Sequence, residues 1–88
     1  MISKTFTFHH PGGIHARPST QLAKAIKGFD ANVFIVRWNE RANLKDVLHV
    51  LSLGIPPGEV QVEADGPDAE KALEQIEKVF KTDFSEFN

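Results

Sequence analysis

Cysteine is absent from this 88-residue chain, which excludes disulfide bonds and zinc sites built from thiolates. Long apolar runs are absent as well, since none approaches the roughly 20 residues that a membrane span requires. The first ten residues alternate polar and apolar side chains, unlike the apolar core of a signal peptide. Positive charge is not in excess either, and the formal net charge of −2 disfavours nucleic acid as a partner. We therefore predict a cytoplasmic protein that engages neither membranes nor nucleic acids.

The remaining composition is that of an ordinary globular protein, with 41% hydrophobic and 25% charged residues. The length suits one small domain, residues 1–88, and no internal repeat or linker divides the sequence. The last residues, 83–88, form a polar tail that contains Phe84 and Phe87. Two outcomes stay open for this tail: it frays, or its phenyl rings pack against the rest of the domain.

Hydrophobic periodicity divides the chain into four strands and three helices. Alternating apolar and polar residues are typical of half-buried strands, and apolar residues spaced three and four apart are typical of amphipathic helices. The predicted strands are 2–8, 32–38, 41–44 and 59–64, and the predicted helices are 17–27, 46–54 and 69–80. The order β-α-β-β-α-β-α predicts an α+β fold, an open-faced β-sandwich. Its four-stranded, mostly antiparallel sheet carries three helices on one face and leaves the other to water.

A short stretch, GGIHARPST from Gly12 to Thr20, marks the junction between the first strand and the first helix. Glycine permits unusual backbone angles and the close approach of a ligand. We expect His15 near the N-cap of the helix, with Pro18 in the first turn, where a missing N–H is tolerated. Helix N-termini present unpaired N–H donors and a partial positive charge, so this junction is a natural anion site.

The residues at this junction suit a histidine that accepts a phosphoryl group. A neutral imidazole at His15 is a nucleophile, and the guanidinium of Arg17 matches phosphate oxygens. A simpler interpretation also stands, in which His15 only caps the helix or lies on the surface. Metal binding together with His9 and His10 is disfavoured, since adjacent residues on a strand point to opposite faces. We therefore expect neither a metal nor a cofactor.

Two segments carry a resemblance to a known family. GGIHARPST resembles the active-site segment of HPr, the histidine-containing phosphocarrier of the bacterial phosphoenolpyruvate:sugar phosphotransferase system. NLKDVLHVLSLGI, from Asn43 to Ile55, is similar to the family segment in which Asn-Leu-Lys-Ser precedes an apolar helix. The distance between the two segments fits the family without gaps, and the predicted order of strands and helices fits over the whole chain.

The resemblance implies a phosphoryl carrier rather than an enzyme, acting as a monomer without a cofactor. Enzyme I would phosphorylate His15 on Nδ1, and Enzyme II A domains would take the group onward for sugar uptake. Arg17 would stabilise the charge in transfer, and the backbone N–H groups of Ala16 and Arg17 would hold the phosphoryl oxygens. Phosphoryl transfer needs mainly positioning and charge stabilisation, so few side chains are required.

The second predicted helix is apolar almost all round, and an exposed apolar surface often marks a partner site. Val50 and Leu53 match core positions of the family. A helix buried on two sides, and lysines that only solvate exposed faces, are the alternatives to a docking surface. By resemblance, the residues that would contact Enzyme I and the A domains are Thr20, Gln21, Lys24, Lys27, Lys45, Val47, Leu48, His49, Leu51 and Ser52.

Two positions depart from the family pattern. Asp46 stands where many members carry a serine that a regulatory kinase phosphorylates, and Gly12 replaces a frequent Ser, Thr or Asn beside the active histidine. Asp caps a helix as well as Ser does; alternatively, its negative charge mimics part of a phosphoserine. The functions left open are a regulatory or nitrogen-related relative of the sugar-type carrier, with a regulatory protein as a further partner, and an interaction module without phosphoryl chemistry.

Overall fold

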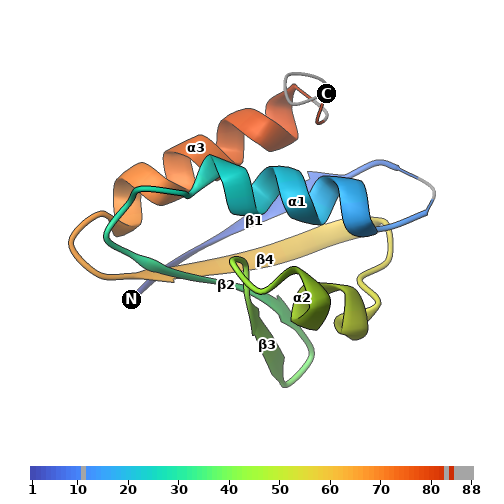
Figure 1. Cartoon of the computed structure of the whole chain (residues 1–88). Helices are drawn as coiled ribbons and strands as arrows, with labels where there is room; N and C mark the ends of the chain where they lie inside the picture. Colours follow the sequence, from blue (N-terminus) through green and yellow to red (C-terminus); the bar gives the residue numbers. More distant parts are fainter. Residues whose placement is uncertain (11, 83, 85–88) are drawn as a thin grey trace.

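The computed structural model of the chain describes residues 1–10, 12–82 and 84 (Figure 1). The strands form one sheet in the order β1-β4-β2-β3, and every neighbouring pair is antiparallel. The predicted α+β fold and the order β-α-β-β-α-β-α are therefore confirmed. The elements are β1 (Ile2–Phe8), α1 (Ala16–Ala25), β2 (Asn32–Arg37), β3 (Glu40–Asn43), α2 (Val47–Leu53), β4 (Gly58–Asp65) and α3 (Ala69–Lys81).

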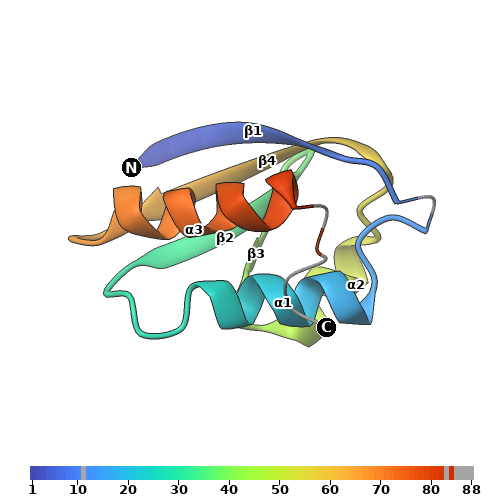
Figure 2. The ribbon, with the colours of Figure 1, turned by 90° about the horizontal axis from the view of Figure 1, so that it is seen from above.

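All three helices lie on one side of the sheet (Figures 1 and 2). α3 packs on β1, β4 and β2, whereas α2 packs on β3 and α1. The alternation in β4 explains this layering, since Val60, Val62 and Ala64 are buried while Glu59 and Gln61 are exposed on the opposite, open face. In the part of the chain that the structure describes, no helix combines the length and the apolar character that crossing a membrane requires.

Lys4 interrupts the apolar series of β1 and reaches α3. Its Nζ lies 2.9 Å from Oε2 of Glu77. The hydrogen bond from Lys4 lowers the pKa of the Glu77 carboxyl, because it favours the charged form. Two residues along β1, the ring of Phe6 stacks on that of Phe80 with the ring centres 4.9 Å apart. An ion pair and an aromatic pair thus join β1 to α3.

One residue of the C-terminal tail packs against the rest of the protein. The ring of Phe84 is buried, and its centre lies 5.1 Å from the ring centres of both Phe8 and Phe80. Its backbone N–H donates to the carbonyl of Val79 at 3.0 Å. Phe84 therefore packs rather than frays, and the prediction for the rest of the 83–88 tail, including Phe87, lies outside the described residues.

The turn between β2 and β3 differs from the prediction, which extended the strand through Trp38 and placed the turn at 39–40. Arg37 pairs with Glu40, so the turn consists of Trp38 and Asn39. Trp38 occupies the first turn position with a φ of +54°, and its side chain is 83% exposed. Tight hairpin turns require a positive φ at this position, whatever the strand propensity of the residue. Hairpin register rather than propensity therefore determines where β2 ends.

Candidate functional site

His15 is the N-cap residue of α1, as the sequence predicts. Its backbone is extended, with φ −106° and ψ −167°, and its carbonyl accepts from the N–H of Ser19 at 3.1 Å. The side chain is exposed and, within the described residues, makes no capping hydrogen bond to the helix. The backbone of His15 therefore begins the helix, while its imidazole stays available for chemistry at the surface.

The loop before His15 is held by the segment that follows α2. The N–H of Ile14 donates to the carbonyl of Ile55 at 2.9 Å, and the side chains of both residues are buried. Gly13 has a φ of +70°, and a Cβ there would lie 2.2 Å from the same carbonyl oxygen. A Cβ on Gly12 would lie 3.6 Å from Cδ2 of His15, at ordinary contact distance. Position 13 therefore requires glycine, whereas position 12 has room for a side chain.

The first turn of α1 offers an anion site beside the imidazole. Ala16 and Arg17 begin the helix, and their N–H groups are among those that no preceding carbonyl of the helix can bind. The sequence of this turn contains no acidic residue that would neutralise the partial positive charge of the helix start. Pro18 follows, and its missing N–H suits this turn. His15 and Arg17 are both exposed at one helix start, where the sequence predicts them together.

A surface hollow of about 360 Å³ lies between α1 and the segment that leads into α2. Thr20, Lys24, Lys27 and Lys45 line it, all with exposed side chains, and Ala23 contributes an apolar surface. We call this feature the lysine hollow. Three ammonium groups around one depression favour a negatively charged partner. Four of the predicted partner-binding residues therefore lie around one depression, while their role in binding stays a prediction.

Gln21 does not belong to that surface. Its side chain is only 3% exposed, so it cannot form part of an accessible rim. Pro18, Leu22 and Ala25 are buried on the same side of α1, and residues three and four apart share one face of a helix. Position 21 therefore faces the interior, which corrects its predicted place among the partner-binding residues.

α2 presents part of its apolar surface to solvent. Leu48 is 79% exposed, whereas Val50 and Leu53 are buried in the core. The alternative that this helix is buried on two sides is therefore wrong, and Leu48 lies outside the core. The other predicted docking residues of α2 are half-buried or exposed: Val47, His49, Leu51 and Ser52.

Asp46 caps α2. Its Oδ1 accepts from the N–H of His49 at 3.2 Å, and its carbonyl accepts from the N–H of Val50 at 3.1 Å. Gly54 ends the helix in the left-handed conformation with a φ of +61°. Both predicted helix ends are confirmed. The carboxylate thus has a structural role that accounts for it, and mimicry of phosphoserine stays a hypothesis.

The surroundings of His9 and His10, which follow β1, differ from those of His15. His9 is exposed, whereas the half-buried ring of His10 has its centre 5.1 Å from that of Phe8. Across residues 1–10, 12–82 and 84, no three His, Cys, Asp or Glu side chains lie together in a way that could hold a metal ion.

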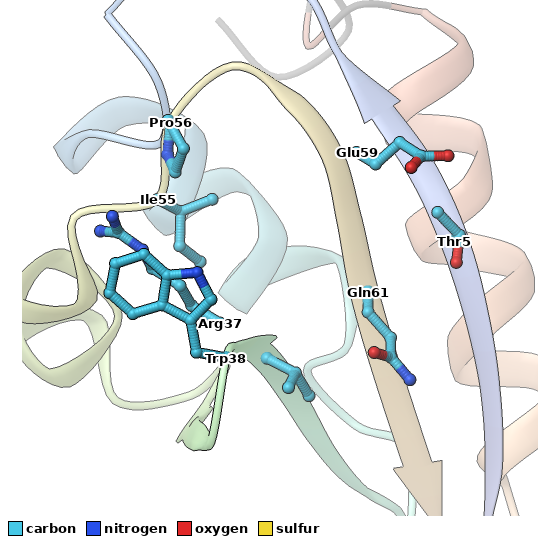
Figure 3. Close-up of a pocket in the computed structure, with 8 residues that line it drawn as sticks. Thr5, Arg37, Trp38, Ile55, Pro56, Glu59 and Gln61 are labelled. Carbon is cyan, nitrogen blue, oxygen red and sulfur yellow. The ribbon is translucent and has the colours of Figure 1, made fainter.

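A second hollow, of about 340 Å³, includes residues of the open face of the sheet (Figure 3). The sequence did not predict it, because its lining comes from three strands and the segment after α2. Arg37 links the β2–β3 hairpin to the end of α2, since its guanidinium carbon lies 4.1 Å from the Trp38 ring centre and its Nη1 donates to the carbonyls of Leu53 and Gly54. The lining includes Thr5, Val36, Arg37, Trp38, Pro56 and Gln61.

Known proteins resemble this chain over most of its length. The family model described as the PTS HPr component phosphorylation site matches residues 2–82. The phosphocarrier protein HPr of Treponema pallidum is 33% identical over 87 residues, which cover 98% of this chain and 99% of the relative. HPr of Mycoplasma capricolum is 37% identical over 67 residues, or 75% of each chain.

Solved structures show the same similarity. An HPr from Thermoanaerobacter tengcongensis superposes with a TM-score of 0.86 at 26% identity, covering 96% of both chains. The histidine-containing phosphocarrier protein of Mycoplasma superposes with a TM-score of 0.84 at 29% identity, covering 94% of this chain and 97% of that one. With sequence and fold both matching over nearly the whole chain, this chain belongs to the HPr family of phosphocarrier proteins of the phosphotransferase system.

Proposed function

We propose that this protein accepts a phosphoryl group from phosphorylated Enzyme I on Nδ1 of His15 and passes it to Enzyme II A domains for sugar uptake. One observation carries the proposal: His15 is the exposed N-cap residue of α1, and the unbonded N–H groups of the first turn and the exposed Arg17 follow it directly in the chain. Membership of the HPr family supports the same role. The protein acts as a carrier that its partners load and unload, without a cofactor of its own.

Transfer at this site requires a nucleophile and charge stabilisation. The lone pair of Nδ1 of His15 forms a bond to phosphorus while the bond from phosphorus to the donor atom of Enzyme I breaks. The imidazole is neutral for this step, with its proton on Nε2. The N–H groups of Ala16 and Arg17 bind the phosphoryl oxygens, and the Arg17 guanidinium stabilises their negative charge. Because the helix dipole contributes only about 0.3–1 kcal/mol, these direct hydrogen bonds supply most of the stabilisation.

Docking uses exposed surfaces of α1 and α2, two helices that pack on each other. Leu48 offers an exposed apolar contact on α2, and the lysine hollow offers positive charge to partners with acidic surfaces. Enzyme I and the A domains use this region in turn, since each must bring its reacting group to the same imidazole. Successive use of one surface suits a monomer. The monomeric state and the cytoplasmic location stay predictions from the sequence.

The decisive experiment is phosphorylation in vitro. Incubation with Enzyme I and labelled phosphoenolpyruvate should attach label that is lost in acid and stable in alkali, as expected for a phosphohistidine. The His15→Ala variant should take up no label, because its nucleophile is gone. Absence of label on the wild-type protein, or label that persists in His15→Ala, would overturn the proposal.

Another exposed histidine provides a matched control. His9→Ala removes an imidazole that precedes the loop and is not part of the proposed docking surface, so this variant should be labelled like the wild type. Loss of label in His9→Ala would show that imidazole removal acts through something other than the acceptor nitrogen. Transfer from the labelled protein to sugar-type or nitrogen-type A domains then separates the proposed carrier from its nitrogen-related alternative.

A further inference from the structure

Arg37, the last residue of β2, links two parts of the molecule that are distant in sequence, the β2–β3 hairpin and the end of α2. Its Nη1 donates to the carbonyls of Leu53 and Gly54, both at 2.5 Å, at the C-terminal end of α2. Its guanidinium carbon lies 4.1 Å from the ring centre of Trp38. In Figure 3 the Arg37 side chain runs beside the Trp38 ring toward the segment that carries Ile55. One half-buried side chain thus holds the end of a helix against the β2–β3 hairpin.

The end of α2 needs a cation that the helix itself lacks. The last carbonyls of a helix have no partners within it and carry a partial negative charge. The last turn of α2 contains no basic residue, so its own sequence provides no compensation. Arg37 supplies the charge from another element, and its planar guanidinium donates to two carbonyls while one face stacks on an indole.

The carbonyls that Arg37 binds lead directly to the His15 loop. Ile55 follows Gly54, and its carbonyl accepts from Ile14, the residue before His15, at 2.9 Å. The backbone of Gly13 lies against the same oxygen, as the 2.2 Å distance to a Cβ there shows. A displacement of residues 54–55 would therefore move the loop that carries His15, because the backbones of the two segments are in close contact.

We propose that Arg37 is a positioning residue for phosphoryl transfer, acting through the end of α2 and the Ile55 carbonyl to fix the loop that carries His15. The inference rests on the proposed function, because it concerns the geometry of the same imidazole. Arg37 touches neither His15 nor the anion site in this role. It determines how firmly the Ile14–Ile55 hydrogen bond is held, and hence how well the imidazole is oriented when a partner docks.

Arg41 offers a matched control on the neighbouring strand. Its Nε lies 3.2 Å from Oε1 of Glu63, and its guanidinium carbon lies 4.8 Å from the ring centre of Phe34. Arg41 is therefore also an arginine on the hairpin that stacks on an aromatic ring. Unlike the contacts of Arg37, these two contacts lie within the sheet and away from α2. Arg41→Gln removes the same charge from the same hairpin.

The test compares Arg37→Gln, Arg37→Lys and Arg41→Gln in the full chain. The first measurement is amide hydrogen exchange at Ile14, which should accelerate about tenfold in Arg37→Gln, less in Arg37→Lys, and not in Arg41→Gln. The second is phosphorylation by Enzyme I, where kcat should fall about tenfold in Arg37→Gln with little change in KM, since positioning and not docking is affected. Arg37→Lys keeps the charge and should recover part of the rate.

Several results would overturn the inference. Unchanged Ile14 exchange in Arg37→Gln, or equal effects in Arg41→Gln, would show that Arg37 has no special link to the loop. A rise in KM alone would assign it to docking instead. If Arg37→Gln fails to fold, Arg37→Lys gives the same two readouts, and no change in either would equally contradict the inference. Absence of wild-type phosphorylation would refute the proposed function, whereas Ile14 exchange still tests whether Arg37 fixes the loop.

Discussion

The helices α1 and α2 begin at exposed residues, but their first turns are built in opposite ways. At α2, the carboxylate of Asp46 accepts from the N–H of His49 at 3.2 Å, so a negative charge of the chain itself occupies the helix start. At α1, His15 caps with its backbone alone, and the first turn contains Arg17 instead of an acid. A helix start that is already neutralised has little to offer an anion, whereas an open one attracts it. The contrast favours α1 over α2 as the place of the proposed phosphoryl chemistry.

The largest expected effect comes from disturbing the support beneath the α1 start. Gly13→Ala would place a Cβ 2.2 Å from the Ile55 carbonyl oxygen, at a φ of +70° that non-glycine residues adopt at a cost. Overpacking and left-handed strain together should lower the free energy of unfolding by about 3 kcal/mol. Chemical denaturation of the two proteins measures this change.

Gly28→Ala separates the two causes. Gly28 also has a positive φ, +94°, but no described atom lies within 4 Å of where its Cβ would be. Only backbone strain remains, so the loss should be about 1–2 kcal/mol. Equal losses in Gly13→Ala and Gly28→Ala would show that the contact with Ile55 is not what restricts position 13.

The next effect concerns the closed start of α2. Asp46→Ala removes the acceptor for the His49 N–H and should destabilise the protein by about 1 kcal/mol. Asp46→Asn retains an acceptor without the charge and should keep most of the stability. Urea denaturation of both variants gives the comparison, and an equal loss in both would mean that charge, rather than the cap, is what Asp46 contributes.

The same position tests the hypothesis of phosphoserine mimicry. Asp46→Ser keeps a capping oxygen and removes the negative charge, which is the property on which phosphoserine mimicry would depend. Because one exposed charge contributes about 0–1 kcal/mol, we expect the rate of phosphorylation by Enzyme I to change less than about fivefold. A much faster reaction would favour mimicry, and the cap would then be an insufficient account of Asp46.

A smaller effect, of opposite sign, is expected when α1 is made to resemble α2. His15→Asp places a carboxylate at the open helix start, where it can accept from the N–H groups of the first turn. The free energy of unfolding should rise by about 0.5–1 kcal/mol relative to His15→Ala, while phosphoryl acceptance is lost. Denaturation curves for both variants, with His15→Asn as a neutral cap, measure the gain.

His15→Asn should recover part of that gain, since an amide oxygen caps a helix without a net charge. If His15→Asp is no more stable than His15→Ala, the N–H groups of the first turn are already satisfied. The start of α1 would then not be open, and the contrast with α2 would fail.

Much of the fold was predictable because its signals are local. Asp46 and Gly54 mark both ends of α2, and a cap needs only the residues beside it. The end of β2 was not predictable, because the turn at Trp38 follows from the pairing of Arg37 with Glu40. The strand propensity of Trp38 does not indicate which residues of β2 and β3 pair with each other.

The site divides in the same way. His15 and Arg17 are neighbours in sequence at a helix start, so their position was predictable. The burial of Gln21 was predicted wrongly, because a polar side chain indicates the solvent side of a helix, whereas the packing of α1 turns this position toward the core. The contacts of Ile55 with Ile14, and of Arg37 with the end of α2, join distant segments, and no motif announces either.

The smallest effect is expected at Ser19 in the first turn of α1, whose backbone N–H donates to the carbonyl of His15. Its side chain is fully buried, and among the described residues Oγ has no hydrogen-bond partner. A buried hydroxyl without a partner is destabilising, so Ser19→Ala should raise the free energy of unfolding by up to about 1 kcal/mol and leave phosphorylation unchanged. Denaturation and labelling by Enzyme I measure both. A loss of stability together with slower labelling would instead mean that the Ser19 hydroxyl stabilises the first turn of α1. Its removal would then also disturb the position of His15.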